Sequence, residues 1–302
     1  MSRRACMPMA ARIDRDRARD VARTDMALGL TSLFRALPDG ARRHEITLQQ
    51  PWCGGLIIIQ GVECSATDQA VLFALLALAG QHDPLPEPAT PAKDNGLMAA
   101  GAAVERGVMR FNTSSAALMR EAGMDPNSHG SRATIRASIR RLAGIVIEGR
   151  HGNDWATTHL IAGAAGRGRD AISVVLSYRL SEALIGACSY ARIEMSAYRA
   201  LNSGVARIAY SWLCSWYAAA TGTRQIGIDA LELHAYGGVA AAKSTRSERR
   251  AALRAALGEI GALPGWAVTV GASGAITITR RTRSQTGLAP NPNRPSAEPA
   301  DG

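Results

Sequence analysis

The 302-residue sequence lacks most of the features that mark secreted, membrane-spanning or metal-binding proteins. Its cysteines, Cys6, Cys53, Cys64, Cys188 and Cys214, are odd in number and form no C-x-x-C pair, so neither a disulfide framework nor a zinc site is expected. No run of about 18 apolar residues is free of charge, which leaves no candidate membrane span. The N-terminus lacks the apolar segment of a secretory signal. We therefore expect a cytoplasmic protein with free thiols and no membrane partner.

Recognisable catalytic motifs are absent as well. The histidines are His44, His82, His129, His151, His159 and His234, and no two of them stand two positions apart. The chain therefore lacks the His-hydrophobe-His metal pair that a DNA-nicking enzyme needs. It also contains no G-x-S-x-G or H-E-x-x-H motif. The sequence predicts a protein that is not an enzyme and that binds no cofactor and no metal.

Lysine is nearly absent, yet the chain is strongly basic. Of its 35 basic residues only Lys93 and Lys243 are lysine, and the formal net charge is +10. Residues 1–25 hold seven arginines and four aspartates, so most of the excess charge lies in the body of the chain. Arginine forms bidentate hydrogen bonds that suit phosphate and guanine. This balance favours an acidic partner such as nucleic acid.

Three segments differ from the rest in composition. Residues 1–27 are charged and lack hydrophobic periodicity, which predicts a flexible basic arm. Residues 282–302 contain four prolines and few apolar residues, which predicts a disordered tail. Residues 82–103 form a proline-rich stretch that fits either a linker between domains or a long loop inside one.

One order of elements is predicted twice. A helix, a turn, an arginine-rich helix, a strand, a glycine-containing turn and a strand fit residues 114–161 and again residues 229–279. A helix-turn-helix followed by a two-stranded hairpin is the order of a winged helix. The sequence thus predicts a helix-rich α+β fold with two winged-helix domains in tandem, over 28–186 and 187–281.

The second helix of each copy carries a stripe of arginines. The stripes are Arg132, Arg136 and Arg140 in a helix predicted over 131–143, and Arg246, Arg250 and Arg254 in one predicted over 244–260. Residues four apart share a helix face, and apolar residues form a neighbouring stripe that can be buried. A biased composition explains arginine in place of lysine but not this alignment. The plain alternative to DNA contact is a solvated helix face.

The winged-helix hypothesis gives a set of candidate DNA-binding residues. In the first copy they are Ser131, Arg132, Thr134, Arg136, Arg140, Arg141, Arg150, His151 and Asn153. In the second copy they are Lys243, Ser244, Thr245, Arg246, Ser247, Arg249, Arg250, Arg254, Ser273, Arg280 and Arg281. Helix residues are expected to reach base edges and phosphates, and hairpin residues to reach the backbone. The aromatic residues Trp155, Trp212, Trp216, Tyr217 and Trp266 are expected to pack in the core instead.

Six strings of the chain stand in a recognisable order. They are LTSLFRAL (30–37), the helix over 67–80, ISVVLSYRLSEALIG (172–186), ARIEMSAYRALNSGVARIAYSWLCSW (191–216), STRSERRAALRAALGEI (244–260) and LPGWAVT (263–269). Together they resemble the IncQ-type plasmid replication protein C family over residues 28–281. The long arm and the proline-rich tail depart from that pattern.

The resemblance implies a replication initiator of two winged-helix domains that binds direct repeats, called iterons, in double-stranded origin DNA. It further implies that binding helps to open an AT-rich region and to load a separate helicase and primase of the same plasmid. A homodimer away from DNA is compatible with it. By position, residues 132–141 and 244–254 would be the recognition helices, and 82–103 a loop. A winged-helix transcriptional repressor and, with less support, a DNA-nicking enzyme are the alternatives.

Overall fold

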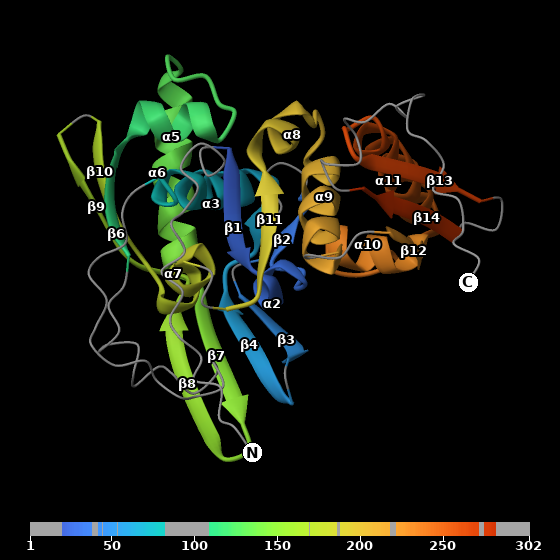
Figure 1. The fold of residues 1–302 in the computed structure, drawn as a ribbon, viewed down its shortest axis with the longest axis horizontal. Helices are drawn as coiled ribbons and strands as arrows, with labels where there is room; N and C mark the ends of the chain where they lie inside the picture. The colour runs from blue at the N-terminus through green and yellow to red at the C-terminus, as the bar shows by residue number, and fades with distance from the viewer. Residues whose placement is uncertain are drawn as a thin grey trace, which may run out of the picture.

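The computed structural model describes residues 20–37, 42–43, 45–52, 54–81, 109–168, 170–185, 188–217, 222–271 and 275–281. Within these ranges the chain forms helices, antiparallel sheets and one parallel pair of short strands, which confirms the expected α+β class. Figure 1 shows two groups of elements, at the left and right of the molecule, with a layer of helices and strands between them. No helix in the described part is long and apolar enough to cross a membrane.

The left-hand group contains the first predicted helix pair and hairpin. The helices are α5 (Ser115–Glu121) and α6 (His129–Ala143). A four-stranded antiparallel sheet has the order β3 (Ile46–Trp52), β4 (Gly55–Gly61), β7 (Val146–His151) and β8 (Asp154–His159). A second sheet has the order β6 (Arg110–Ser114), β10 (Ala171–Leu176) and β9 (Ile161–Arg167). The predicted hairpin β7–β8 does not stand alone, because β7 also pairs with β4.

The right-hand group contains the second predicted helix pair and hairpin. The helices are α10 (Ile228–Tyr236) and α11 (Lys243–Gly261). One antiparallel sheet has the order β12 (Gly222–Gly227), β14 (Ala275–Arg280) and β13 (Trp266–Val270). Helix α10 ends at Gly237, whose φ of 74° suits glycine, and a Cβ there would lie 2.2 Å from the guanidinium carbon of Arg35. This close approach fixes the turn after α10 against the N-terminal half of the chain.

The layer between the two groups is built around α3 (Ala66–Ala79). The other elements of this layer are β1 (Val21–Asp25), α2 (Met26–Gly29), β2 (Phe34–Arg35), β5 (Cys64–Ser65), α7 (Tyr178–Ile185), β11 (Tyr190–Glu194), α8 (Met195–Ala200) and α9 (Gly204–Tyr217). Helix α3 is buried on nearly every side and contacts β1, α5, α6 and α9. One hydrophobic cluster includes residues of all three parts, so the core continues across the predicted domain boundary.

The structure corrects the end of the predicted arm. Residues 21–25 form β1, which pairs antiparallel with β11 from Val21 opposite Glu194 to Asp25 opposite Tyr190. The Asp25 carboxylate is buried, accepts a hydrogen bond from the backbone N–H of Leu28 at 3.0 Å and is paired with Arg179. Its partner Arg179 is 154 residues away along the chain, so no local sequence pattern indicates the pair. Residues 1–19, 82–103 and 282–302 lie outside the described residues, and the predictions for them remain predictions.

A buried carboxylate joins α3 to α6. The Asp68 side chain is fully buried near the start of α3. Its Oδ1 accepts hydrogen bonds from Nε and Nη2 of Arg141 at 3.0 and 2.7 Å, and its Oδ2 accepts from Nη1 of Arg42 at 2.7 Å. Burial alone raises the pKa of Asp68, but hydrogen bonds from Arg141, the Ser65 backbone and Arg42 outweigh it and hold the pKa below its usual value.

Polar side chains also join α3 to the C-terminal half. The Gln69 amide donates from Nε2 to Oγ of Ser211 at 2.7 Å, and its Oε1 accepts from the Tyr198 hydroxyl at 3.1 Å. All three side chains are buried. Because an amide that is both donor and acceptor fits only one arrangement of partners, this network fixes how α3, α8 and α9 meet.

Replacing Arg141 tests the role assigned to it in the core. Arg141→Ala is expected to lower the free energy of unfolding by about 3 kcal/mol, at the low end for a buried charge that loses one partner, because Arg42 remains. The loss should be full above the ordinary pKa of an aspartate and should fade as the pH falls through the lowered pKa of Asp68.

Urea unfolding at neutral pH and in acid measures both effects. The neighbouring Arg140→Ala is the matched control, because its side chain is exposed, and it should change stability by less than about 0.5 kcal/mol. An equal loss of unfolding free energy in the two variants would contradict the role of Arg141 as a core partner of Asp68.

Gln69→Leu tests the connection between the two halves. It leaves the buried Tyr198 hydroxyl without its acceptor, so the free energy of unfolding should fall by about 1–3 kcal/mol. Gln49→Leu, on an exposed position of β3, is the control and should have little effect. Thermal and urea unfolding of both variants measure the difference, and unchanged stability of Gln69→Leu would contradict the network's role.

Candidate nucleic-acid interface

Helix α6 buries an apolar stripe and exposes a basic one, as the spacing predicts. Ile135, Ile139 and Leu142 are buried in the core. Arg136 and Arg140 are exposed and Arg132 is half-buried. Among the residues that the structure describes, none forms an ion pair or hydrogen bond with these three guanidinium groups. In the described part of the chain, the side chains of Arg136 and Arg140 thus face solvent.

Arg141 was predicted in the same set, but the structure turns it into the fold. It follows Arg140 directly, and successive residues of an α-helix point about 100° apart. Its guanidinium meets Asp68 and also donates from Nη2 to Oγ of Ser138 at 3.1 Å. The buried carboxylate accounts for this arginine, which is not part of the free stripe.

The stripe of α11 is engaged to a greater extent within its own chain. Nε of Arg246 donates to the carbonyl of Ala240 at 2.9 Å, and Nη2 of Arg250 donates to Oδ1 of Asp229. Arg254 is exposed, and no described residue pairs with its guanidinium. Two of the three predicted stripe arginines therefore also hold α11 against α10 and the turn before it.

Arg249 has a similar role beside the stripe. Its Nη1 donates to the carbonyl of Gly238 at 3.1 Å and lies 3.7 Å from Oε1 of Glu232, while the guanidinium stands 4.6 Å from the centroid of the Tyr236 ring. Sequence reasoning missed these partners. The available signal was the pair of acids in α10, Asp229 and Glu232, which faces the arginines of α11.

The short polar candidates lie near the N-terminal ends of the two helices. Lys243, Ser244 and Ser247 are exposed and Thr245 is half-buried on α11; Ser131 and Thr134 are half-buried on α6. The Thr134 hydroxyl donates to the carbonyl of Gly130 at 3.0 Å. The N-cap of α11 is Ala242, which has no side chain to cap the first N–H groups. That end of α11 is thus suited to an anion.

The hairpin candidates divide into three groups. Arg150, His151 and Asn153 are exposed around the β7–β8 turn, and Nε of Arg150 is paired with Glu148. Arg281 is exposed, whereas Arg280 is half-buried with its guanidinium 5.1 Å from the centroid of the Trp266 ring. Ser273 lies outside the described residues.

The structure confirms, for four of the five aromatic residues, the prediction that they pack in the core. Trp212 and Tyr217 are buried, and Trp216 and Trp266 are partly buried against the core. The prediction for Trp155 is wrong, because its side chain is 69% exposed. Strand β8 is an edge of its sheet, and this position points away from the buried face.

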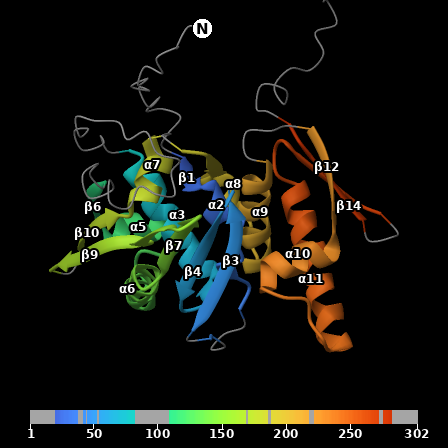
Figure 2. The ribbon, with the colours of Figure 1, turned by 90° about the horizontal axis from the view of Figure 1, so that it is seen from below.

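The two striped helices reach the same side of the molecule. In Figure 2, α6 and the N-terminal end of α11 both lie along the lower side of the view, and the β3–β4 hairpin lies between them. Helix α6 is seen end-on there and α11 from its side, so their axes cross instead of running parallel. Both helices thus lie at one side of the molecule, and each has exposed arginines: Arg136 and Arg140 on α6, and Arg254 on α11.

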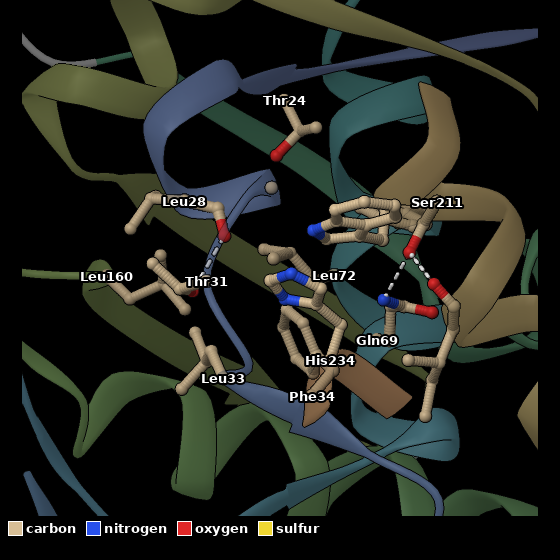
Figure 3. A pocket seen from close by; sticks show the side chains of 14 residues that line it. Thr24, Leu28, Thr31, Leu33, Phe34, Gln69, Leu72, Leu160, Ser211 and His234 are labelled. Atoms are coloured by element: carbon tan, nitrogen blue, oxygen red, sulfur yellow. Dashed lines mark hydrogen bonds between the residues drawn. The ribbon is translucent and has the colours of Figure 1, made fainter. Parts of the chain in front are cut away.

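A small pocket lies where the N-terminal and C-terminal halves meet. Leu28, Thr31 and Leu33 line it from one half and Ser211 and His234 from the other (Figure 3). Its cavity volume of about 20 Å³ leaves room for about one water molecule. Burial lowers the pKa of His234 to about 4, so its imidazole is neutral. This pocket is too small for a substrate and lies inside the fold.

Comparison with known proteins gives one family and a set of similar folds. The family model of replication protein C (RepC) matches residues 16–282. No curated protein matches the sequence. The structure of domains 2–3 of RctB is 12% identical, with a TM-score of 0.53, and covers 85% of this chain and 98% of that chain.

A second solved structure, the Pi initiator protein in complex with iteron DNA, is 13% identical with a TM-score of 0.53. It covers 87% of this chain and 98% of that chain. At such identities the likeness shows a shared fold. The family model, in contrast, spans most of the sequence. The chain therefore belongs to the replication protein C family.

Proposed function

We propose that this protein initiates plasmid replication by binding directly repeated double-stranded DNA with α6 and α11 together. The observation that carries the proposal is the presence of two arginine-striped helices at one side of a single molecule (Figure 2). The family supports a role in replication, and the fold is shared with an initiator bound to iteron DNA. The transcriptional repressor and the DNA-nicking enzyme have no comparable support.

The two DNA-reading units in this proposal are winged-helix domains over 28–186 and 187–281. Each unit has a short helix, a striped helix and a hairpin in that order: α5, α6 and β7–β8, then α10, α11 and β13–β14. The three-stranded sheet β12-β14-β13 completes the second unit. In the first unit the hairpin is extended by β4 and β3 instead.

The free cations and the short polar residues have different tasks in this proposal. A major groove about 12 Å wide accepts one helix. Arg132, Arg136 and Arg140 on α6, and Arg254 on α11, neutralise phosphates and set the register, while the serines and threonines near the helix starts read base edges. Arg246, Arg249 and Arg250 keep α11 in place and contribute charge from partly exposed positions.

Two readers on one chain give tighter binding than either alone. Once the first helix is bound, the second is held near its own groove, so its binding is effectively intramolecular. The proposal extends to the opening of an adjacent AT-rich region, to a helicase and primase of the same plasmid as partners, and to a homodimer away from DNA. The family resemblance supports these further steps.

Arg136→Ala and Arg254→Ala test whether the stripes bind phosphate. Each should weaken binding to a duplex with tandem repeats, and the slope of log K against log salt should fall by about 0.9 for each phosphate that the variant no longer neutralises. Fluorescence anisotropy over a salt series measures both quantities. Arg110→Ala, an exposed arginine of β6 outside both helices, is the control and should change neither. Stripe variants that behave like the control would show that the stripes are solvated faces.

A strand-opening assay separates an initiator from a repressor. The protein is incubated with supercoiled DNA that holds tandem repeats beside an AT-rich segment, and unpaired thymines are detected with permanganate. An initiator should make thymines in that segment reactive only when the repeats are present. Tight binding that leaves every thymine unreactive would favour the repressor.

A further inference from the structure

The exposed indole of Trp155 has no role in the fold or in the duplex contacts proposed above. Its side chain is 69% exposed, the highest fraction among the exposed large hydrophobic residues of the described chain. Tryptophan is rarely left so open to water, since burial of an aromatic ring is strongly favourable. An aromatic face kept in solvent on a regular strand suggests a binding role.

The register of the sheet shows what surrounds this indole. Trp155 lies directly opposite Arg150, which in turn lies opposite Leu56. Opposed residues of antiparallel strands share a face of the sheet, so the next row on that face contains Thr157, Glu148, Ile58 and Gln49. Arg150 and Thr157 are exposed, Leu56 and Glu148 are half-buried, and Ile58 is buried. The exposed neighbours of Trp155 on β7 and β8 are therefore hydrogen-bonding side chains.

The β7–β8 hairpin places Trp155 well away from the C-terminal end of α6. Strand β7 begins three residues after α6 ends, and Nδ1 of His159 lies 3.0 Å from the carbonyl of Ala143 at the end of α6. Trp155 stands four residues along β8 from His159, which places it roughly 13 Å further out. In Figure 1 the β7–β8 hairpin extends downward from α6, beyond the body of the left-hand group. Trp155 therefore stands apart from the helix face that is proposed to enter the duplex groove.

We propose that Trp155 is a stacking site for an unpaired nucleobase, as presented by single-stranded DNA. The face of a base is flat and apolar, and its edge and backbone are polar, which matches an exposed ring that lies opposite Arg150. A protein partner would instead require a contiguous apolar area, but Arg150 and Glu148 of β7 separate Trp155 from Leu56 and Ile58 of β4. The inference rests on the proposed function only in taking DNA as the ligand.

Such a site would favour strand separation by mass action. A ligand that binds one of two states shifts the equilibrium toward that state by its differential affinity. A base stacked on Trp155 cannot pair with its complement. Stacking therefore lowers the free energy of the strand-separated DNA and leaves that of the duplex unchanged. The duplex contacts and the stacking contact therefore perform separate tasks with separate residues.

The test compares Trp155→Ala with Trp155→Phe in the full chain. Thr47→Ala is the control, because Thr47 is exposed on the same face of the sheet but on the far edge strand β3. Fluorescence anisotropy measures binding to a labelled single-stranded oligothymidine and, separately, to the tandem-repeat duplex. Trp155→Ala should weaken single-strand binding roughly five- to hundredfold, as expected for loss of one stacked base, while duplex binding stays unchanged. Trp155→Phe should retain most of the affinity, and Thr47→Ala nearly all of it.

The salt dependence gives a second readout. Because stacking neutralises no phosphate, Trp155→Ala should lower the affinity by the same factor at low and high salt, unlike the arginine variants. Equal single-strand binding by Trp155→Ala and the unchanged protein, or no single-strand binding by either, would overturn the inference. So would a self-association that Trp155→Ala alone abolishes, since the ring would then be an interface between copies. If the unchanged protein binds the single strand through Trp155 but does not bind the tandem-repeat duplex, the proposed function is overturned and this inference stands.

Discussion

The direction in which α6 presents its arginines depends on the ion pair between Asp68 and Arg141. Asp68 stands at the start of the most deeply buried helix, α3, and Arg141 belongs to α6 itself. Because Arg141 is drawn toward the core, the rotation of α6 about its own axis is set, and Arg136 and Arg140 must point outward. The buried stripe of Ile135, Ile139 and Leu142 favours the same rotation, and the ion pair adds a polar contact that this orientation of α6 satisfies. The free surface of α6 is thus a consequence of a contact inside the protein.

The C-terminal half uses the same chemistry for a different purpose. Arg249 meets Glu232, Arg250 meets Asp229, and the backbone N–H of Ala36 donates to the carbonyl of Ala235 at 2.7 Å, which ties α10 to the N-terminal half. Several arginines are therefore used to hold helices together. Each ion pair uses one arginine and one acid and leaves the net charge of +10 unchanged, so the net charge indicates the kind of partner, while the total of 35 basic residues overstates the number of cations that remain for it.

Periodicity predicted the elements that carry their own pattern. The arginine and apolar stripes located α6 and α11 to within about two residues, and glycine turns located both hairpins. Strand β1 was missed because its partner β11 is distant in the sequence, and β9 was missed because its alanines and glycines do not alternate with polar residues. The partners of Arg141 and Arg250, and the exposure of Trp155, depend on packing between segments that no local pattern describes. Which residues form stripes could thus be predicted, but not which members of a stripe are free.

The pairing of β1 with β11 has a consequence for synthesis. Strand β1 precedes every other described helix and strand in the chain, yet its partner is Tyr190–Glu194, more than half a chain later. During translation β1 remains unpaired until β11 has been made. Contacts between residues so far apart in sequence form late, because closing the long intervening loop costs entropy. Asp25 keeps a charge on this waiting strand, which opposes its association with other nascent chains. The two-stranded sheet of β1 and β11 can therefore form only after synthesis has passed Glu194.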